Sequence, residues 1–189
     1  MCQTEKSDHT VAKGKLQSTQ IPKTKWSEIS IDFVTDLHTT ANNKDTILVI
    51  VDKATMMVHL VPCRKNIIAT RTTQLLWKTI IRYHGILWVI YLDRGAQFTA
   101  KNWQELCMIG TKLWYRTAYH HKTQGVVERM NVVVSQTFCY LIHDSQSVKN
   151  WKTLLPTMET VINSLPHQST RFSHFPLITD MNPGHQYSC

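Results

Sequence analysis

EISIDFVTDL, residues 28–37, reads as a β-strand because apolar residues recur at every second position. Its two faces differ in chemistry: Ile29, Ile31 and Phe33 lie on one, and Ser30, Asp32 and Val34 lie on the other. A turn cluster, TTANNKD, follows it. The stretch therefore predicts a strand that packs one face on a core and carries a carboxylate on the other.

Two further strands follow at short intervals. TILVIVDKA (46–54) is a continuous β-branched run, which is typical of a strand buried on both faces. MMVHLVPCRK (56–65) comes directly behind it. With residues 28–37, these segments predict three antiparallel strands joined by short turns.

The remaining chain alternates between helical and strand patterns. Apolar residues recur every three to four positions in 69–85, and Gly85 is well placed to end that helix. The other expected elements are a strand at 87–93, a helix at 99–110, a strand at 111–119 and helices at 125–144 and 148–167, the last with Pro156 inside it. The order β-β-β-α-β-α-β-α-α predicts an α/β fold with a mixed sheet packed by helices.

Length and charge limit the possible functions. The chain has 189 residues, of which 42% are hydrophobic, and this suits one domain with a real core. It has 21 Lys and Arg against 13 Asp and Glu, a formal charge of +8. Such a balance favours a polyanionic partner, nucleic acid first and an anionic membrane second. The alternative is a small basic domain that binds neither.

The cysteine pattern and the hydropathy argue against several other classes. The five cysteines are scattered, and no C-x2-C pair occurs, so we expect no complete zinc site. A reduced, intracellular chain is the simplest interpretation. We find neither a signal peptide nor an apolar run of membrane-spanning length, and expect no membrane partner. Four tryptophans at helical or pre-strand positions are interpreted as core residues rather than base-stacking platforms: Trp26, Trp77, Trp103 and Trp151.

Three acidic residues stand where catalysis would need them. Asp32 lies within a strand, Asp93 ends a buried strand, and Glu128 lies in the first turn of the expected helix 125–144. Carboxylates at strand ends and helix starts can converge at one edge of a mixed sheet. Their mutual repulsion is relieved if they hold Mg²⁺ or Mn²⁺. Two such ions would serve phosphodiester chemistry.

Each acid also has a structural interpretation. Asp32 can be an exposed face residue, with Asp36 and Asp52 as nearby competitors for a catalytic role. Asp93, before Arg94 and Gly95, can be a turn residue. Glu128 can be a partner of the helix dipole, a contribution of about 0.3–1 kcal/mol.

Several motifs in order along the chain carry a family resemblance. ISIDFVT, VDKAT, YLDRGAQFT, GTK, TAYHHKTQGVVERMN, NWKTLLP and VINSLPHQST together resemble the integrase core of long-terminal-repeat retrotransposons of the Ty3/gypsy type, within the retroviral integrase superfamily. The resemblance runs from roughly Cys2 to Phe175. It implies an RNase H-like fold and a metal-holding D,D,E triad of Asp32, Asp93 and Glu128. It also implies DNA integration by 3′-end processing and strand transfer, in the nucleus, on element ends and target DNA.

The same resemblance assigns roles around the triad. Gln97, Tyr119 and Asn131 stand at motif positions that line the site or contact DNA. Lys122 and Arg129 are expected to contact phosphate, which positions DNA without reading its sequence. His120 lies beside the loop before the catalytic helix, and is assigned to the same DNA-binding group. Integrases of this kind act as multimers, so a homo-oligomer is expected.

The chain also departs from the family pattern. The spacing from Asp93 to Glu128 is one residue shorter than usual, and His121-Lys122 stands where Pro-Gln is common. We divide the chain into a lead-in (1–25, the remnant of a zinc-binding domain end, since Cys2-Gln3 resembles its last ligand), a catalytic core (26–170) and an irregular tail (171–189). The departures suggest a truncated or decayed copy. The alternatives to an integrase are therefore a non-catalytic DNA-binding RNase H-like module and an inactive transposon remnant.

Overall fold

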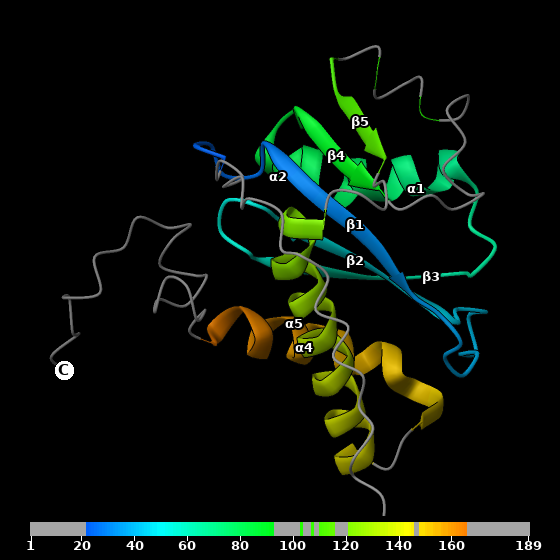
Figure 1. Ribbon diagram of the computed structural model, residues 1–189. Coiled ribbons are helices and arrows are strands. Elements are labelled where there is room, and N and C mark those ends of the chain that lie inside the picture. The colour runs from blue at the N-terminus through cyan, green and yellow to red at the C-terminus, as the bar shows by residue number, and fades with distance from the viewer. Residues whose placement is uncertain are drawn as a thin grey trace, which may run out of the picture.

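The computed structural model describes residues 22–92, 103, 107, 110–115, 121–145 and 148–165 (Figure 1). For residues 121–128, 144–145 and 148–149 it describes the backbone alone. The expected division of the chain at residues 25 and 170 stays a prediction.

A five-stranded sheet forms the centre of the molecule. Its strands are β1 (Glu28–Val34), β2 (Thr46–Asp52), β3 (Val58–Cys63), β4 (Val89–Leu92) and β5 (Lys112–Tyr115). Their order across the sheet is β3-β2-β1-β4-β5. β2 pairs antiparallel with both β1 and β3, whereas β4 pairs parallel with β1 and β5 pairs parallel with β4. The sequence-based prediction of an α/β fold with a mixed sheet is confirmed.

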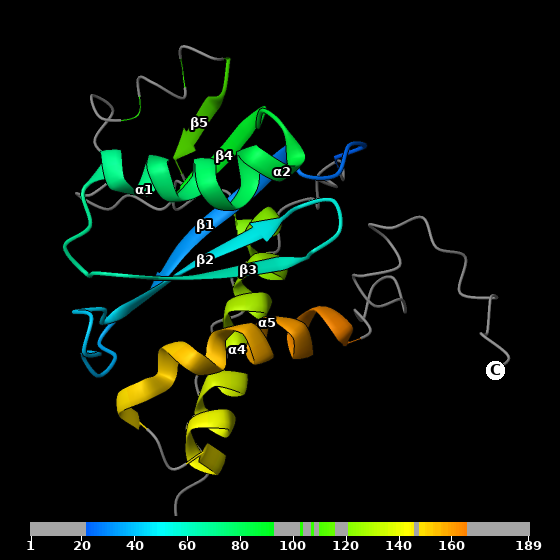
Figure 2. The same ribbon diagram turned by 180° about the vertical axis from the view of Figure 1, so that it is seen from behind.

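One face of the sheet is covered by a helical run (Figure 2). It consists of α1 (Ala69–Leu76), a π-helical segment η1 (Trp77–Ile81) and α2 (Arg82–His84). Leu76 and Ile80 pack with Ile29 and Ile31 of β1 in the core on this side. The run ends at Gly85, which has a positive φ of 88°. Glycine adopts positive φ with little strain because it has no Cβ atom. The helix expected at 69–85 is thus confirmed, although its sequence did not predict the π-helical segment.

The opposite face carries α4 (His121–Ser145), a 3₁₀ segment η4 (Val148–Leu154) and α5 (Leu155–Ser164) (Figure 1). Met130 and Val134 of α4 pack with Val49 and Val51 of β2 in a second core. All of β2 is buried. A strand buried on both faces, as its β-branched run predicted, therefore separates the two cores.

Two helix starts differ from the prediction. α4 begins at His121 rather than residue 125, because nothing in residues 121–124 breaks a helix and an interior Gly125 costs only about 1 kcal/mol. Pro156 does not lie inside a helix but in the first turn of α5. Proline fits there because its missing N–H would have no partner in the first turn.

The predicted tryptophan positions are confirmed in three cases of four. Trp26, Trp103 and Trp151 are at most 3% exposed. Trp77 is 49% exposed, so the interpretation of Trp77 as core was wrong. A helical pattern shows that Trp77 lies on a helix but does not show whether its side chain faces the core or the solvent. Packing against the sheet decides which face of the helix is covered.

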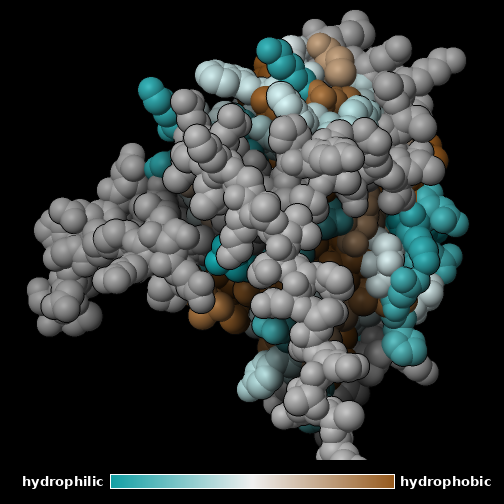
Figure 3. All heavy atoms as spheres, viewed as in Figure 1, coloured by the Kyte–Doolittle hydropathy of each residue, from teal (hydrophilic) through white to brown (hydrophobic). Residues whose placement is uncertain are grey.

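Two surface properties complete the description. On the face that α4 occupies, hydrophobic residues lie in the middle and hydrophilic residues gather at one side (Figure 3). Within the part of the chain that the structure describes, no helix is both long and apolar enough to cross a membrane.

Candidate active site

Asp32 is the fifth residue of β1 and lies on the α4 face of the sheet. Its cross-strand partner is Val49, a member of the core beneath α4. The Asp32 side chain is half-buried, and its Oδ1 accepts a hydrogen bond of 2.8 Å from the backbone N–H of Phe33. The carboxylate therefore faces α4 and is held from its own strand.

The second contact of Asp32 comes from α4. The side-chain amide of Asn131 donates a hydrogen bond to Oδ2 of Asp32. Asn131 is flanked by the buried Met130, which anchors this turn of α4 in the core. Because Glu128 precedes Asn131 by three residues, the two positions are neighbours on one helix face. The structure thus brings together the α4 face that carries Glu128 and the β1 face that carries Asp32.

The position of Glu128 removes one of its two interpretations. α4 starts at His121, so Glu128 is the eighth residue of the helix and not part of its first turn. The favourable effect of the helix dipole on an acid is confined to the first turn. The prediction that placed Glu128 in the first turn was wrong, and the dipole interpretation fails with it.

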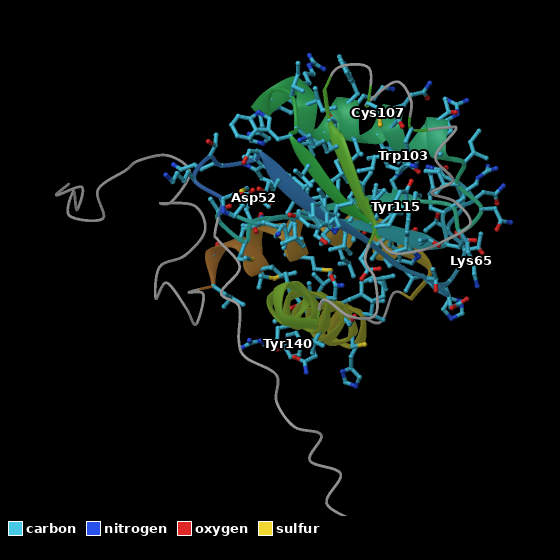
Figure 4. The ribbon with its side chains drawn as sticks, turned by 45° about the horizontal axis from the view of Figure 1, so that its top comes forward. Asp52, Lys65, Trp103, Cys107, Tyr115 and Tyr140 are labelled. Carbon is cyan, nitrogen blue, oxygen red and sulfur yellow. The ribbon has the colours of Figure 1, made fainter. Side chains whose placement is uncertain are left out.

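The competing carboxylate of Asp52 has a structural role. It is fully buried and accepts hydrogen bonds from the backbone N–H of Trp26 (3.0 Å), the backbone N–H of Thr55 (3.0 Å) and Oγ1 of Thr55 (2.6 Å). It pairs with Ile29, near the start of β1, and lies at the end of the sheet away from Lys65 (Figure 4). Asp52 therefore ties the β2–β3 turn to the entry of β1.

The other competitor, Asp36, is exposed. Its carboxylate lies 2.6 Å from Nζ of Lys65, and this hydrogen bond and ion pair lower the pKa of Asp36. An exposed side chain on a solvated ion pair lacks the enclosure that a reaction site needs. The first two strands and their turn hold four aspartates, Asp32, Asp36, Asp45 and Asp52, and Asp32 contacts a side chain of α4.

The remaining candidates are described in part or not at all. Asp93, Gln97, Tyr119 and His120 lie outside the described residues. Lys122 and Glu128 have a described backbone within α4, and Arg129 is exposed on the same helix. The structure thus brings together two of the predicted site residues, Asp32 and Asn131.

The atoms around Asp32 suit a hard cation. Asp32 offers carboxylate oxygens, and Oδ1 of Asn131 is buried without a hydrogen-bond partner. Oxygen atoms of carboxylates and amides are the ligands that Mg²⁺ and Mn²⁺ prefer. Among the described side chains no three acidic, His or Cys groups form a metal cluster. The donor chemistry at Asp32 and Asn131 fits a divalent ion that is completed by further oxygen ligands.

Comparison with known proteins gives the chain its relatives. No family model matches it. The polyproteins of the transposons Tf2-3 and Tf2-4 of Schizosaccharomyces pombe are each 26% identical over 183 residues, which is 96% of this chain and 14% of each polyprotein. The chain therefore spans about a seventh of the length of these curated relatives.

Solved structures share the fold. The simian T-cell lymphotropic virus intasome in complex with the PP2A regulatory subunit B56γ matches at a TM-score of 0.70 and 15% identity, over 95% of this chain and 64% of that chain. The HTLV-2 integrase catalytic core domain in complex with magnesium matches at 0.62 and 17% identity, over 81% of this chain and 96% of that one. The BIV integrase catalytic core domain matches at 0.62 and 18% identity, over 82% and 95%.

The chain resembles integrase cores of the retroviral integrase superfamily and shares their fold. The sheet order, the long α4 on the Asp32 face and the resemblance over nearly the whole chain agree on this point. The predicted RNase H-like fold is confirmed, and the predicted resemblance to integrase cores is supported.

A cluster that the sequence did not predict lies on the same face of the sheet as Asp32. Nζ of Lys53 lies 3.7 Å from the ring centroid of Tyr91 and 3.6 Å from Oε2 of Glu28. The Tyr91 hydroxyl donates to the same Glu28 oxygen at 3.0 Å. The alternation of Glu28, Ser30 and Asp32 signalled one face for all three, but the sequence holds no sign that Lys53 and Tyr91 meet there.

Proposed function

We propose that this integrase core inserts DNA by metal-dependent phosphoryl transfer, through 3′-end processing and strand transfer. The observation that carries the proposal is the hydrogen bond from Asn131 of α4 to Asp32 of β1. It sets the helix that carries Glu128 against the half-buried carboxylate of Asp32. Relatives that include transposon polyproteins and integrase cores support this function.

The pairing of β1 with β4 supports the inclusion of Asp93. The two strands run parallel, with Ser30 opposite Tyr91. Asp32 follows Ser30 by two residues, and Asp93 follows Tyr91 by two residues. Asp32 and Asp93 thus stand at the same sequence offset from a paired position of β1 and β4. We therefore infer that Asp32, Asp93 and Glu128 form one carboxylate site at the carboxyl ends of β1 and β4.

Each residue has a distinct role in this proposal. Asp32, Asp93 and Glu128 would hold one or two divalent ions, and Asn131 would fix the rotamer of Asp32. Bound Mg²⁺ or Mn²⁺ would supply Lewis acidity for the attacking water or hydroxyl and for the leaving oxygen. One of the solved relatives is an integrase core in complex with magnesium.

DNA contacts are proposed around this site. Arg129 is exposed one residue after Glu128, and an excess of eight positive charges favours a polyanion. Lys122 and Arg129 would contact phosphates, and Gln97, Tyr119 and His120 would line the path of the DNA.

The substrates would be element ends and target DNA, and the nucleus is the compartment that holds such a target. One solved relative is an intasome and another was solved in a trimeric form, so we propose a homo-oligomer as the active species.

A DNA-processing assay tests the proposal. The purified chain is incubated with labelled duplexes whose terminal positions are randomised, together with target DNA and Mn²⁺ or Mg²⁺. We expect release of a dinucleotide from 3′ ends and joined products. Asp32→Asn, Asp93→Asn and Glu128→Gln should each reduce both by on the order of 100-fold or more, because each removes a charge that the reaction centre needs.

Asp36→Asn is the matched control. It removes an exposed carboxylate close in sequence to Asp32, and it should leave the activity unchanged. Equal loss in Asp36→Asn and Asp32→Asn would contradict the assignment of Asp32. Salt-dependent DNA binding without cleavage or joining would instead support the non-catalytic DNA-binding module.

A further inference from the structure

A pair of aromatic rings lies beside Asp32 on the same face of the sheet. Tyr91 of β4 pairs with Trp114 of β5, and their ring centroids are 6.2 Å apart with planes 29° from parallel. Tyr91 also pairs with Ser30 of β1, two residues before Asp32. Cross-strand neighbours share a face, so Trp114, Tyr91 and Asp32 all lie on the α4 face of the sheet.

Trp114 differs from the core tryptophans in its exposure. It is 54% exposed, whereas Trp26, Trp103 and Trp151 are at most 3% exposed. Its ring is therefore held on one side by Tyr91 and open to solvent over much of its surface. A large aromatic ring left open on a sheet face offers a flat apolar surface for another ring.

The second ring is fixed in place by charged groups. Nζ of Lys53, a buried residue, lies 3.7 Å from the centroid of the Tyr91 ring, and the Tyr91 hydroxyl donates to Glu28 at 3.0 Å. These two contacts hold the face and the far end of the Tyr91 ring. Little conformational freedom is left for a ligand to remove, so the ring pair is preorganised for stacking.

The charges around the ring pair favour a nucleic-acid ligand. Lys53 and Glu28 lie 3.6 Å apart and balance each other, so the aromatic rings rather than a net charge dominate at Tyr91. Lys112 precedes Trp114 by two residues on β5, shares its face and is exposed. A flat ring for a base beside an exposed cation for a phosphate is the combination found in single-strand binding sites.

We propose that Trp114, Tyr91 and Lys53, here called the aromatic platform, stack an unpaired DNA nucleotide beside the catalytic site. The path from Trp114 to Asp32 crosses two strand spacings, from β5 to β4 and from β4 to β1, and then runs two residues along β1. The Cα atoms of Trp114 and Asp32 are therefore about 12 Å apart. Bases within a duplex have no free face, so the ligand is a nucleotide without a partner. Removal of a dinucleotide from a 3′ end leaves such nucleotides as a 5′ overhang. This identity of the ligand rests on the proposed function.

Binding to two DNA ends tests the aromatic platform. The affinity of the purified chain is measured by fluorescence anisotropy, without divalent metal, for a blunt duplex and for the same duplex with a two-nucleotide 5′ overhang. Wild type should bind the overhang duplex more tightly. Trp114→Ala should weaken overhang binding by about tenfold, which is within the effect of losing one stacked base. Trp114→Phe, which retains a ring, should keep most of the preference.

Trp77→Ala is the control for the loss of an exposed tryptophan. Trp77 is 49% exposed in η1, in the helical run on the opposite face of the sheet, and its loss should alter neither affinity. Unfolding midpoints of all variants in urea check that each is folded. Trp114→Phe keeps the test valid if Trp114→Ala is unfolded, because loss of the preference in a folded Phe variant contradicts ring stacking.

The outcomes separate this inference from the proposed function. Trp114→Ala can weaken binding of the blunt and the overhang duplex equally, or weaken neither. Either result overturns the aromatic platform. The proposed function is unaffected by that result, because strand transfer is measured in a separate assay. If overhang binding depends on Trp114 but wild type neither cleaves nor joins DNA, the platform stands and the proposed catalysis fails. If wild type binds no DNA in either form, both are overturned.

Discussion

At the residue scale, Asp32 and Asp52 show how surroundings decide the role of one side-chain type. Both lie in central strands, and both aspartates accept hydrogen bonds. Asp52 is fully enclosed by donors from its own turn and from Trp26. Asp32 is half-buried and meets a side chain from α4. The first is thus committed to its turn, whereas the second lies at the contact between β1 and α4.

Asp52→Ala should destabilise the protein strongly. The substitution leaves the N–H groups of Trp26 and Thr55 buried without an acceptor, at a cost of about 3 kcal/mol. The unfolding midpoint in urea, measured by tryptophan fluorescence, should fall accordingly. Asp36→Ala, which removes an exposed carboxylate, should scarcely move the midpoint. An equal effect of both variants would show that Asp52 does not anchor the turn.

At the element scale, α5 covers the β3 edge of the sheet. β3 is the outer strand beyond β2, and its free backbone groups would invite another chain to pair. The Asn163 side chain accepts from the N–H of Val58 and donates to its C=O, both at 2.9 Å. Glu159 accepts from the N–H of Leu60 at 3.0 Å. Two side chains one helical turn apart thus satisfy the edge of β3.

Asn163→Leu should open this edge. The leucine side chain has a similar volume but leaves both backbone groups of Val58 buried and unpaired, which costs about 2–4 kcal/mol. We expect a lower urea midpoint and concentration-dependent aggregation, measured by light scattering. Thr160→Val is the control, since Thr160 is exposed and its hydroxyl bonds only within α5. Unchanged stability in Asn163→Leu would show that the edge contact contributes nothing.

At the scale of the whole molecule, two cores on either side of one sheet govern stability. A buried thiol and a half-buried phenol make that stability depend on pH. Burial raises the pKa of the Cys63 thiol to about 12. Burial, the hydrogen bond to Glu28 and the charge of Glu28 raise the pKa of the Tyr91 hydroxyl to about 12. Both groups stay neutral in the folded protein at a pH where the unfolded chain would release their protons.

Stability should therefore fall in alkali. The ordinary pKa values are 9.0 for the thiol and 10.0 for the phenol, so the unfolded state gains from ionisation above about pH 9. The contribution of both groups is complete below those values and is lost as the pH rises towards about 12. Urea midpoints measured from about pH 8 to pH 12 should decline. Cys63→Ala should flatten the decline, and Cys139→Ala, which removes an exposed thiol, should not. A parallel decline in wild type and Cys63→Ala would contradict the role of Cys63.

Local patterns predicted the elements that have one dominant signal. The alternation in residues 28–37 and the β-branched run after it gave β1 and β2, and Gly85 marked the end of the first helical run. The start of α4 and the exposure of Trp77 were wrong, because neither a helix boundary nor the covered face of a helix follows from a few residues. Asp32 was identified as a candidate, but its competitors Asp36 and Asp52 could be set aside only through their contacts.

The sequence by itself predicted a mixed sheet packed by helices and the acids worth testing, since side-chain period and composition act over a few neighbouring residues. Tertiary structure alone decided that Asn131 meets Asp32, that Asn163 closes the β3 edge, and that Trp114 stacks on Tyr91. Asn131 lies 99 residues from Asp32 along the chain, and Asn163 lies 105 from Val58. Contacts across such separations form only when the strands pair in one register, and that register is set by the packing of both cores.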